Sequence, residues 1–402
     1  MVAKLDKIFD SFVKNRLFKD KSILQISHTP NNITHRDEQI EEVAAILAPA
    51  LTGEKASNLF LFGKTGTGKT LCVKYVCDEM LKRVKQDGQD NLKFVYINCK
   101  MGKAADTEYR ILAEIIKGLG GSVPITGLPT GSVYDKFKEL VDERKQMIVI
   151  ILDEIDQAVK KNSDSFLYSL TRVNSDLKNS QISLIGISNS LVFKDYLDPR
   201  VRSSLGEEEL VFPSYNALQL QDILKNRAEN SFKEGALDED VIPKCAAFAA
   251  REHGDARRAL DLLRVAGEVA EREGSKKVIQ GHIDKANDKL EKDNMLEAIK
   301  KQPIQFQLVL YSIMKLYSSK NKSSFFTGDV FREYENLCSE TKNDVLTQRR
   351  VSDIIQEFDM LGLINTEVIS KGRQGRTREI KLMISKKIFS NAEGILRDSL
   401  NI

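Results

Sequence analysis

The sequence predicts an α/β fold, in which a parallel sheet with helices on both faces is followed by a helical region and a smaller C-terminal unit. Three observations predict this order. Nearly continuous apolar runs alternate with longer helical patterns between about residues 20 and 212, as they do when strands are buried on both faces. Helical patterns alone come next, and the C-terminal part combines helices with two alternating runs. The apolar runs are residues 58–62, 93–99, 147–154 and 182–190.

The composition is that of a globular protein with several domains. The chain has 402 residues, of which 41% are hydrophobic and 30% charged, and a chain of this length holds about two to four domains. Its net charge of +3 does not by itself indicate a nucleic-acid partner. The amphipathic N-terminal stretch lacks the apolar run of a signal peptide or membrane span, and the five cysteines form no CxxC pair. We therefore expect a cytoplasmic protein with reduced cysteines and no membrane partner.

The helix-only region begins after the segment "VFPSYN" and ends near residue 295, within the polar segment "KLEKDN". These changes of pattern predict three domains. They are an α/β core (residues 1–212), a helical second domain (213–295) and a C-terminal domain (296–402).

The C-terminal domain has the pattern of a winged helix. Helical patterns cover about residues 296–318 and 327–339, and a third helix ends at Gly362. Two strand-like runs, "LINTEVI" and "TREIKLMI", follow. Helices followed by a two-stranded hairpin predict a winged-helix module. One apolar face of the third helix is formed by Val351, Ile354, Ile355, Phe358 and Leu361.

A phosphate-binding loop is the strongest motif in the chain. The segment "GKTGTGKT", residues 63–70, matches G-x-x-x-x-G-K-[ST] in full, follows an apolar run and opens a helical pattern. In such a loop backbone N–H groups surround the phosphates, Lys69 reaches the β and γ phosphates, and Thr70 offers a hydroxyl to Mg²⁺. The alternative is a fortuitous glycine-rich turn. The predicted contacts are Lys64, Thr65, Gly66, Thr67, Gly68, Lys69 and Thr70.

The run "IVIILDEID" places Asp153 and Glu154 at the carboxyl end of a strand, where α/β sheets bind their ligands. We expect Asp153, together with Thr70, to hold Mg²⁺. Glu154 would orient or deprotonate the attacking water. The alternative is that both acids merely end a strand.

Two further groups follow along the core. Asn189, at the end of the run "ISLIGIS", is placed to test for a γ-phosphate, although an asparagine also suits a turn there. Arg200 and Arg202 lie in the segment "LDPRVRSS". Either could reach a neighbouring subunit's phosphate as an arginine finger, or be a solvated loop arginine.

The second domain contributes three more candidates. Arg227 interrupts an apolar helix face, and a buried guanidinium is costly unless an anion meets it. Tyr215 has a flat ring suited to lie against a base. Arg257 and Arg258 occupy a helix's first turn, against the helix dipole, so that a phosphate would compensate them. The alternative for this arginine pair is pairing with local acids.

Positive charge is concentrated at the predicted hairpin tip, where like charges repel unless phosphates supply the counter-charge. The cluster consists of Lys371, Arg373, Arg376 and Arg378. The first turn of the third helix adds Gln348, Arg349 and Arg350. Cations there oppose the dipole but suit a helix whose start enters a DNA groove. We expect phosphate contacts with double-stranded DNA, with sequence preference from Gln348, Arg349 or Ser352; the alternative is a solvated charge cluster.

Taken in order, these motifs resemble those of AAA+ ATPases, and among them the archaeal replication initiators related to the eukaryotic origin recognition complex and its cell division control loader. The resemblance spans nearly the whole chain. It rests on "ITHRDEQIEEV", "GKTGTGKT", "ILDEID", "GISNS", "LDPRVRSSL", "FPSYNALQLQDILKNRAE" and "GDARRALDLLR".

The resemblance implies an AAA+ core with a helical lid and a winged-helix DNA-binding domain. It further implies ATP contacts from Tyr215 and Arg227 in the lid, with Asn189 as sensor 1 and Arg257 as sensor 2. It makes Arg200 the likelier finger, and it implies a second DNA-touching element in a loop-rich insertion between about residues 100 and 135.

The expected function is that of a nucleoid-associated replication initiator that binds origin DNA, helps to recruit or load the replicative helicase and self-associates on DNA. ATP or ADP with Mg²⁺ would be its cofactors, and slow ATP hydrolysis would act as a switch. One rival is an ATP-dependent transcription or transposition regulator. Another is a protein-remodelling ATPase whose winged helix binds protein.

Overall fold

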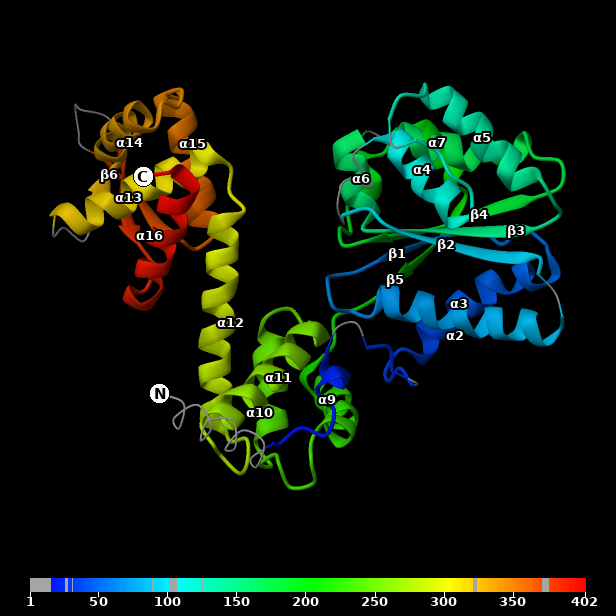
Figure 1. Ribbon diagram of the computed structural model, residues 1–402, viewed down its shortest axis with the longest axis horizontal. Helices are drawn as coiled ribbons and strands as arrows, with labels where there is room; N and C mark the ends of the chain where they lie inside the picture. The colour runs from blue at the N-terminus through cyan, green and yellow to red at the C-terminus, as the bar shows by residue number, and fades with distance from the viewer. Residues whose placement is uncertain are drawn as a thin grey trace, which may run out of the picture. The chain divides into compact units, whose positions relative to one another are not determined.

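The computed structural model describes residues 16–25, 28–30, 32–88, 90–100, 107–124, 126–162, 164–320, 324–370 and 376–402. It divides into two compact units between Ile283 and Asp284. The first unit holds the sheet and the helical region, and the second holds the C-terminal module (Figure 1). Within the described residues, none of the helices has the length and apolar character needed to cross a membrane.

The sheet of the first unit has five parallel strands in the order β2-β3-β4-β1-β5. The strands are β1 (Asn58–Phe62), β2 (Leu92–Asn98), β3 (Met147–Asp153), β4 (Gln181–Ser188) and β5 (Glu207–Val211). The first four coincide with the predicted apolar runs to within two residues at each end, which confirms the parallel sheet. The fifth strand lies at an edge and has three consecutive glutamates, with only Leu210 buried. Such a strand gives no apolar run to recognise.

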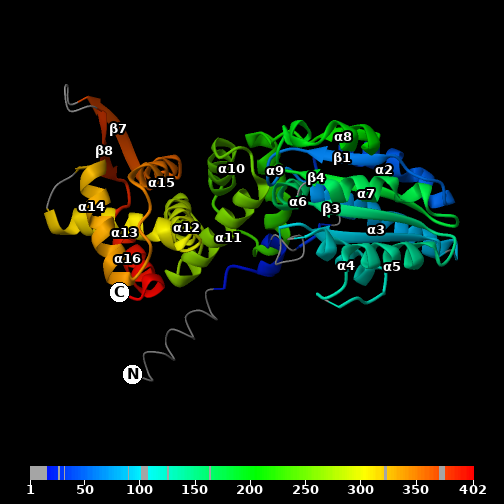
Figure 2. The same ribbon diagram turned by 90° about the horizontal axis from the view of Figure 1, so that it is seen from above.

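Helices cover both faces of this sheet (Figures 1 and 2). On one face lie α2 (Asp37–Leu47) and α3 (Lys69–Gln86). On the other lie α4 (Glu108–Gly118), α5 (Thr130–Asp142), α6 (Ile155–Asn162), α7 (Ser165–Arg172) and α8 (Pro199–Leu205). The insertion expected to be loop-rich therefore carries α4 and the start of α5.

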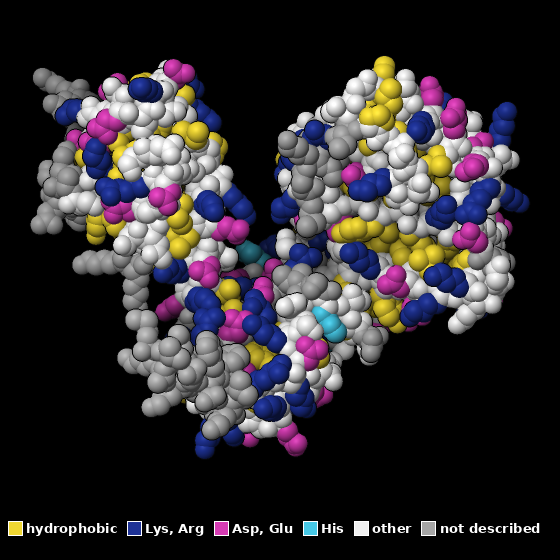
Figure 3. Space-filling view, in the orientation of Figure 1, with side chains coloured by type: hydrophobic (Ala, Val, Ile, Leu, Met, Phe, Trp, Pro, Cys, Tyr) yellow, Lys and Arg dark blue, Asp and Glu magenta, His cyan; other side chains and the backbone are white. Residues whose placement is uncertain are grey.

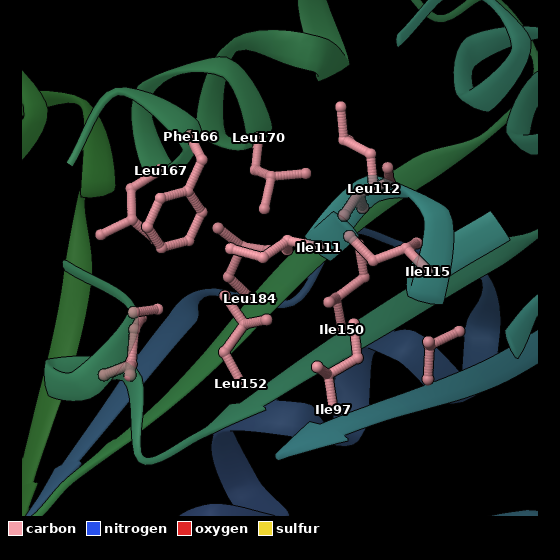
Figure 4. Close-up of a cluster of buried hydrophobic side chains, with 14 of the residues drawn as sticks. Ile97, Ile111, Leu112, Ile115, Ile150, Leu152, Phe166, Leu167, Leu170 and Leu184 are labelled. Atoms are coloured by element: carbon pink, nitrogen blue, oxygen red, sulfur yellow. The ribbon is translucent and has the colours of Figure 1, made fainter. Parts of the chain in front are cut away.

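The two faces of the sheet are packed as separate apolar clusters. Figure 4 shows one of them, in which Ile97, Leu152 and Leu184 of the strands meet Ile111 of α4 and Phe166 of α7. All five side chains are almost fully buried. A rigid sheet packed in this way fixes the carboxyl ends of its strands, where the candidate site lies.

Three helices after β5 form the lid, namely α9 (Ala217–Ser231), α10 (Val241–Arg251) and α11 (Ala256–Arg272). A capping box starts α9, because the Asn216 side chain accepts from the N–H of Gln219 and the Gln219 side chain accepts from the N–H of Asn216. The next helix, α12 (Gln280–Lys300), runs without a break through the polar segment near residue 295. The domain limits named above stay predictions.

An N-terminal segment packs against the lid, which the sequence patterns did not indicate. The rings of Phe18 and Phe232 are 4.4 Å apart. The buried carboxylate of Glu271 accepts hydrogen bonds from the backbone N–H groups of Leu17 and Phe18. A short 3₁₀ helix, η1 (Lys21–Leu24), follows and contacts α9 and α11.

The C-terminal unit is a winged helix, as predicted. Its helices are α13 (Ile304–Lys320), α14 (Thr327–Thr341), α15 (Gln348–Met360) and α16 (Lys386–Leu400), and its strands are β6 (Phe325–Phe326), β7 (Ile364–Ser370) and β8 (Arg376–Leu382). The strands form an antiparallel sheet in the order β6-β8-β7. Gly362 follows α15 with a φ of 69°, which favours glycine and ends the helix as predicted. Neither the two-residue strand β6 nor α16 was predicted.

Candidate nucleotide-binding site

The phosphate-binding loop joins β1 to α3 at the carboxyl edge of the sheet, as its motif predicts. Gly66 and Gly68 have φ angles of 75° and 94°, a region that glycine adopts without strain. A Cβ atom at Gly66 would lie 1.7 Å from Oδ1 of Asp255. Glycine is therefore required at position 66 by conformation and by the close approach of the lid.

Lys69 begins α3 with its side chain almost fully buried at the centre of the loop. Its Nζ donates to the carbonyls of Gly63 at 2.7 Å and Lys64 at 2.8 Å, and to Oδ1 of Asn189 at 3.1 Å. Burial lowers the pKa of Lys69 to about 8, against the opposing attraction of Asp153. The structure thus brings together Lys69 and Asn189, two candidates separated by most of the core sequence.

The acidic pair follows β3 directly. Asp153 is only 6% exposed, and its Oδ2 accepts from the hydroxyl of Thr70 at 2.9 Å and from the hydroxyl of Tyr96 at 2.6 Å. Glu154 has a φ of 55° and an ion pair with Lys100 at 3.3 Å. Thr70 and Asp153, predicted to share a metal ion, are therefore adjacent, and Glu154 lies beside them.

Asp156 is a site residue that the motif analysis left without a role. Its buried carboxylate accepts from the Ser188 hydroxyl at 3.4 Å and from the backbone N–H of Asn189 at 3.3 Å through the same oxygen. The second oxygen accepts from the side chain of Gln157. Asp156 therefore fixes the turn that carries Asn189. The signal that could have identified Asp156 as a site residue is its position at a helix start, three residues after Asp153.

A cavity of about 830 Å³ lies between the phosphate-binding loop, the strand ends and the lid. Most of the predicted nucleotide contacts line it. They are Thr65, Gly66, Thr67, Gly68, Lys69, Thr70, Asp153, Glu154, Asn189, Tyr215, Arg227 and Arg257. The N-terminal segment also contributes, through Ile23, Gln25 and His28.

Arg227 joins the lid to the N-terminal segment. Its Nη1 donates to the carbonyl of Ile23 at 3.2 Å and its Nη2 to the carbonyl of His28 at 3.3 Å. Burial lowers the pKa of the Arg227 guanidinium. Because these acceptors are neutral, the positive charge at this wall of the cavity is suited to attract an anion.

Arg36, in the segment "ITHRDEQIEEV", is a second residue whose role could not be predicted. It is 2% exposed, and its Nε donates to the carbonyl of Thr67 at 2.9 Å while its Nη2 donates to the carbonyl of Pro213 at 2.6 Å. Its guanidinium carbon lies 3.9 Å from the ring centre of Tyr215. Arg36 thus connects the phosphate-binding loop to the start of the lid, and it covers one side of the Tyr215 ring.

The lid touches the phosphate-binding loop directly. Asp255 caps α11 by accepting from the N–H groups of Arg257 at 2.7 Å and Arg258 at 3.3 Å. The N–H of Ala256 donates to the carbonyl of Gly66 at 3.3 Å. Burial raises the pKa of Asp255, an effect that these backbone donors oppose. The first turn of α11, with Arg257, is therefore held at the edge of the phosphate site.

Four of the candidate residues, Lys64, Arg200, Arg202 and Arg258, lie outside the cavity lining. Lys64 Nζ is 3.3 Å from Nδ1 of His253 in the lid. Arg200 has 83% of its side chain exposed and pairs with Asp198 at 3.2 Å. Its proposed reach to a neighbouring subunit stays a prediction.

The candidate DNA-contacting residues belong to the C-terminal unit. Gln348, Arg349 and Arg350 are exposed in the first turn of α15. Arg378 is instead bound to that helix, because its Nη1 donates to the carbonyl and hydroxyl oxygens of Ser352 at 3.1 and 3.0 Å. Its Nη2 donates to Oε1 of Gln356 at 3.2 Å. Lys371 and Arg373 lie outside the described residues, and so does the side chain of Arg376.

Charge is mixed over the visible surface of both units. Figure 3 shows Lys and Arg side chains interspersed with Asp and Glu side chains. This agrees with the small net charge of the chain. Overall charge alone therefore does not indicate a nucleic-acid surface.

Three family models match the chain. They describe an AAA domain (residues 52–192), a Cdc6 AAA+ ATPase-type lid domain (221–288) and the C-terminal winged helix domain of CDC6 (297–392). The matches follow one another in the order of the predicted core, lid and winged helix.

Curated relatives match almost end to end. An ORC1-type DNA replication protein of Thermococcus onnurineus is 52% identical over 386 residues, which are 95% of this chain and 92% of the relative. The ORC1-type DNA replication protein of Pyrococcus furiosus is 53% identical over 393 residues, covering 96% and 92%.

Among solved structures, the Aeropyrum pernix ORC1 protein in complex with DNA has a TM-score of 0.83 at 43% identity, covering 95% of this chain and 97% of that one. The Aeropyrum pernix ORC2 protein in its ADPNP-ADP complexes has a TM-score of 0.61 at 19% identity, covering 96% and 100%, which shows the fold alone.

Proposed function

Because the chain belongs to the family of archaeal ORC1-type DNA replication proteins, we propose that it is an ATP-dependent initiator that binds origin DNA and helps to recruit or load the replicative helicase. Its AAA domain and lid place it among the AAA+ ATPases. The observation that carries the proposal is the convergence of Lys69, Asp153 and Asn189 with lid arginines on one cavity.

The cavity suits ATP or ADP. The phosphates would lie against the N–H groups of the phosphate-binding loop and the ammonium of Lys69, at the N-terminus of α3. Asn189 and Arg257 border the same end, where a γ-phosphate distinguishes ATP from ADP. The base would lie toward Tyr215 and the N-terminal segment.

Thr70 and Asp153 fit a magnesium ion, because a hydroxyl and a carboxylate are the hard oxygen ligands that Mg²⁺ accepts, with phosphates and water completing its shell. When bound, Mg²⁺ would neutralise charge on the terminal phosphates. Glu154 would orient or deprotonate the attacking water, a role typically worth about 10² to 10⁴ in rate.

The contacts between loop and lid support a switch. Asp255 packs against Gly66, and the N–H of Ala256 donates to the Gly66 carbonyl. A γ-phosphate in the loop would attract Arg257 from the same helix turn. Loss of that phosphate would then change how the lid is held, and slow hydrolysis would set how long the ATP state lasts.

DNA binding would use the winged helix, with α15 as the recognition helix and β7, β8 and the residues between them as the wing. Arg349 and Arg350 extend from the start of the recognition helix with Gln348, and Lys371, Arg373 and Arg376 belong to the wing. Arg378 would act by joining the wing to the recognition helix. The DNA-bound ORC1 relative of Aeropyrum pernix supports this use of the fold. The exposed Arg200 on α8 would serve self-association on DNA.

Nuclease protection across the region that contains the chain's own gene tests the proposal, with ATP or ADP present. An initiator should protect repeated sites where replication begins. Protection confined to promoters would instead favour a transcription regulator. Failure to bind any duplex in a salt-dependent way would favour a protein-remodelling ATPase.

A further inference from the structure

We propose that Tyr96 is a positioning residue that orients the Asp153 carboxylate toward Mg²⁺. Tyr96 belongs to β2, borders the cavity and donates its hydroxyl to Oδ2 of Asp153 at 2.6 Å. The inference deepens the proposed function and rests on it, because it assigns a role at the same nucleotide site.

The carboxylate of Asp153 is held at both of its oxygens. Oδ1 accepts from the backbone N–H of Glu154 at 3.0 Å. Oδ2 accepts from the hydroxyls of Thr70 and Tyr96 at 2.9 and 2.6 Å. With both oxygens hydrogen-bonded, rotation of the carboxylate would break at least one short contact. Its direction is therefore set before a cation arrives.

The two residues that donate these hydroxyls belong to different elements of the fold. Thr70 belongs to the phosphate-binding loop and the first turn of α3. Tyr96 belongs to the sheet, where its β2 position is paired with Ile151 of β3 and Asn98 is paired with Asp153. Tyr96 thus supplies a second donor from a different element, the sheet that also carries Asp153.

The Tyr96 ring is itself fixed from α3. The ammonium of Lys74 lies 4.1 Å from the ring centre, a cation–π distance. A residue that only filled space would need neither the hydroxyl nor the approach to a carboxylate.

The test is the Mg²⁺ dependence of nucleotide binding by the full chain, measured with a fluorescent ATP analogue. The variant Tyr96→Phe keeps the ring and its contact with Lys74 and removes only the hydroxyl. Loss of an outer partner of a metal ligand typically costs about 10- to 100-fold in metal affinity. In Tyr96→Phe, the Mg²⁺ concentration that gives half of the maximal increase in analogue affinity should rise by about that factor. The affinity for the analogue in EDTA should be unchanged.

Two controls isolate the hydroxyl. Tyr134→Phe removes a phenol that donates to the carbonyl of Ser169 and lies outside the cavity lining, and it should leave the Mg²⁺ dependence as in the parent. In the Asp153→Asn background, Tyr96→Phe should add little, because the carboxylate through which Tyr96 acts is gone.

An unchanged Mg²⁺ dependence in Tyr96→Phe would overturn the inference. So would an equal loss of affinity with Mg²⁺ and with EDTA, which would indicate a structural role alone. If the parent chain itself bound no analogue under either condition, the proposed nucleotide site would fail, and the inference with it.

Discussion

The guanidinium of Arg378, on the second strand of the wing, donates through one nitrogen to both the carbonyl and the hydroxyl oxygen of Ser352 on the recognition helix. A second nitrogen donates to Gln356, one turn later. The guanidinium is thus used inside the domain, to hold wing and helix together. Arg378 differs in this respect from the arginines at the start of the recognition helix, which are exposed.

Arg378→Gln and Arg350→Gln should therefore weaken duplex binding in different ways. Loss of a phosphate contact reduces the slope of log affinity against log salt concentration by about 0.9. We expect that reduction for Arg350→Gln. For Arg378→Gln we expect weaker binding with the salt slope of the parent. This substitution disturbs the alignment of wing and recognition helix but removes no phosphate contact. Titrations at several salt concentrations measure both, and equal slope losses would contradict the positioning role of Arg378.

Asp156→Ala should impair hydrolysis more than nucleotide binding. The substitution leaves the backbone N–H of Asn189 without its acceptor, whereas the hydroxyl of Ser188 keeps the carbonyl of Ser190 at 3.1 Å. An unsatisfied buried donor costs about 1–3 kcal/mol, so the free energy of unfolding should fall by about that amount. Because Asn189 is proposed to meet only the γ-phosphate, single-turnover ATP hydrolysis should slow while ADP affinity stays near the parent's.

Asp176→Ala, which changes an exposed carboxylate outside the cavity lining, serves as the control for Asp156→Ala. If ADP and ATP affinities fell together in Asp156→Ala, with hydrolysis of bound ATP unchanged, Asp156 would have no role in placing Asn189.

Arg36 and Tyr215 should be energetically coupled. A desolvated cation–π pair is worth about 2 kcal/mol, and residues in contact show coupling energies of about 0.5–3 kcal/mol. A double-mutant cycle of Arg36→Met and Tyr215→Leu, measured by denaturant unfolding, should give a coupling in this range. Each single variant should also weaken nucleotide binding, since both residues adjoin the phosphate-binding loop. Additive effects of the two changes would show that the stacking at 3.9 Å stabilises neither the lid nor the loop.

The parts of the fold that could be predicted are those with a strong local signal. Strands β1 to β4 are apolar along most of their length, and the recognition helix has a clear apolar face. Strand β5 was not predicted, because Glu207 to Glu209 lie at an edge of the sheet, where pairing with β1 needs no apolar run. Strand β6 has only two residues, Phe325 and Phe326, which is too short for an alternating pattern.

In the candidate site, too, some residues could be predicted from a local signal and others could not. The phosphate-binding loop and Asp153 follow from motif and spacing. The partners of Arg36 lie as far away as Pro213, and those of Arg227 lie in the N-terminal segment. A buried arginine can be recognised as unusual in a helix pattern. The carbonyls that it binds are chosen by tertiary packing, which periodicity does not encode.

We propose that nucleotide in the cavity between core and lid governs how firmly the winged helix holds a duplex. The most direct measurement is the affinity for duplex origin DNA of the parent and of Lys69→Ala, each with a non-hydrolysable ATP analogue and with ADP. Coupling between two sites is typically about 1–3 kcal/mol, or about 5- to 150-fold. The parent should show a difference of this size between the two nucleotides. Lys69→Ala, shown to be folded by its thermal transition, should show none. A parent that binds the duplex equally with either nucleotide, or a Lys69→Ala variant that keeps the difference, would contradict the claim.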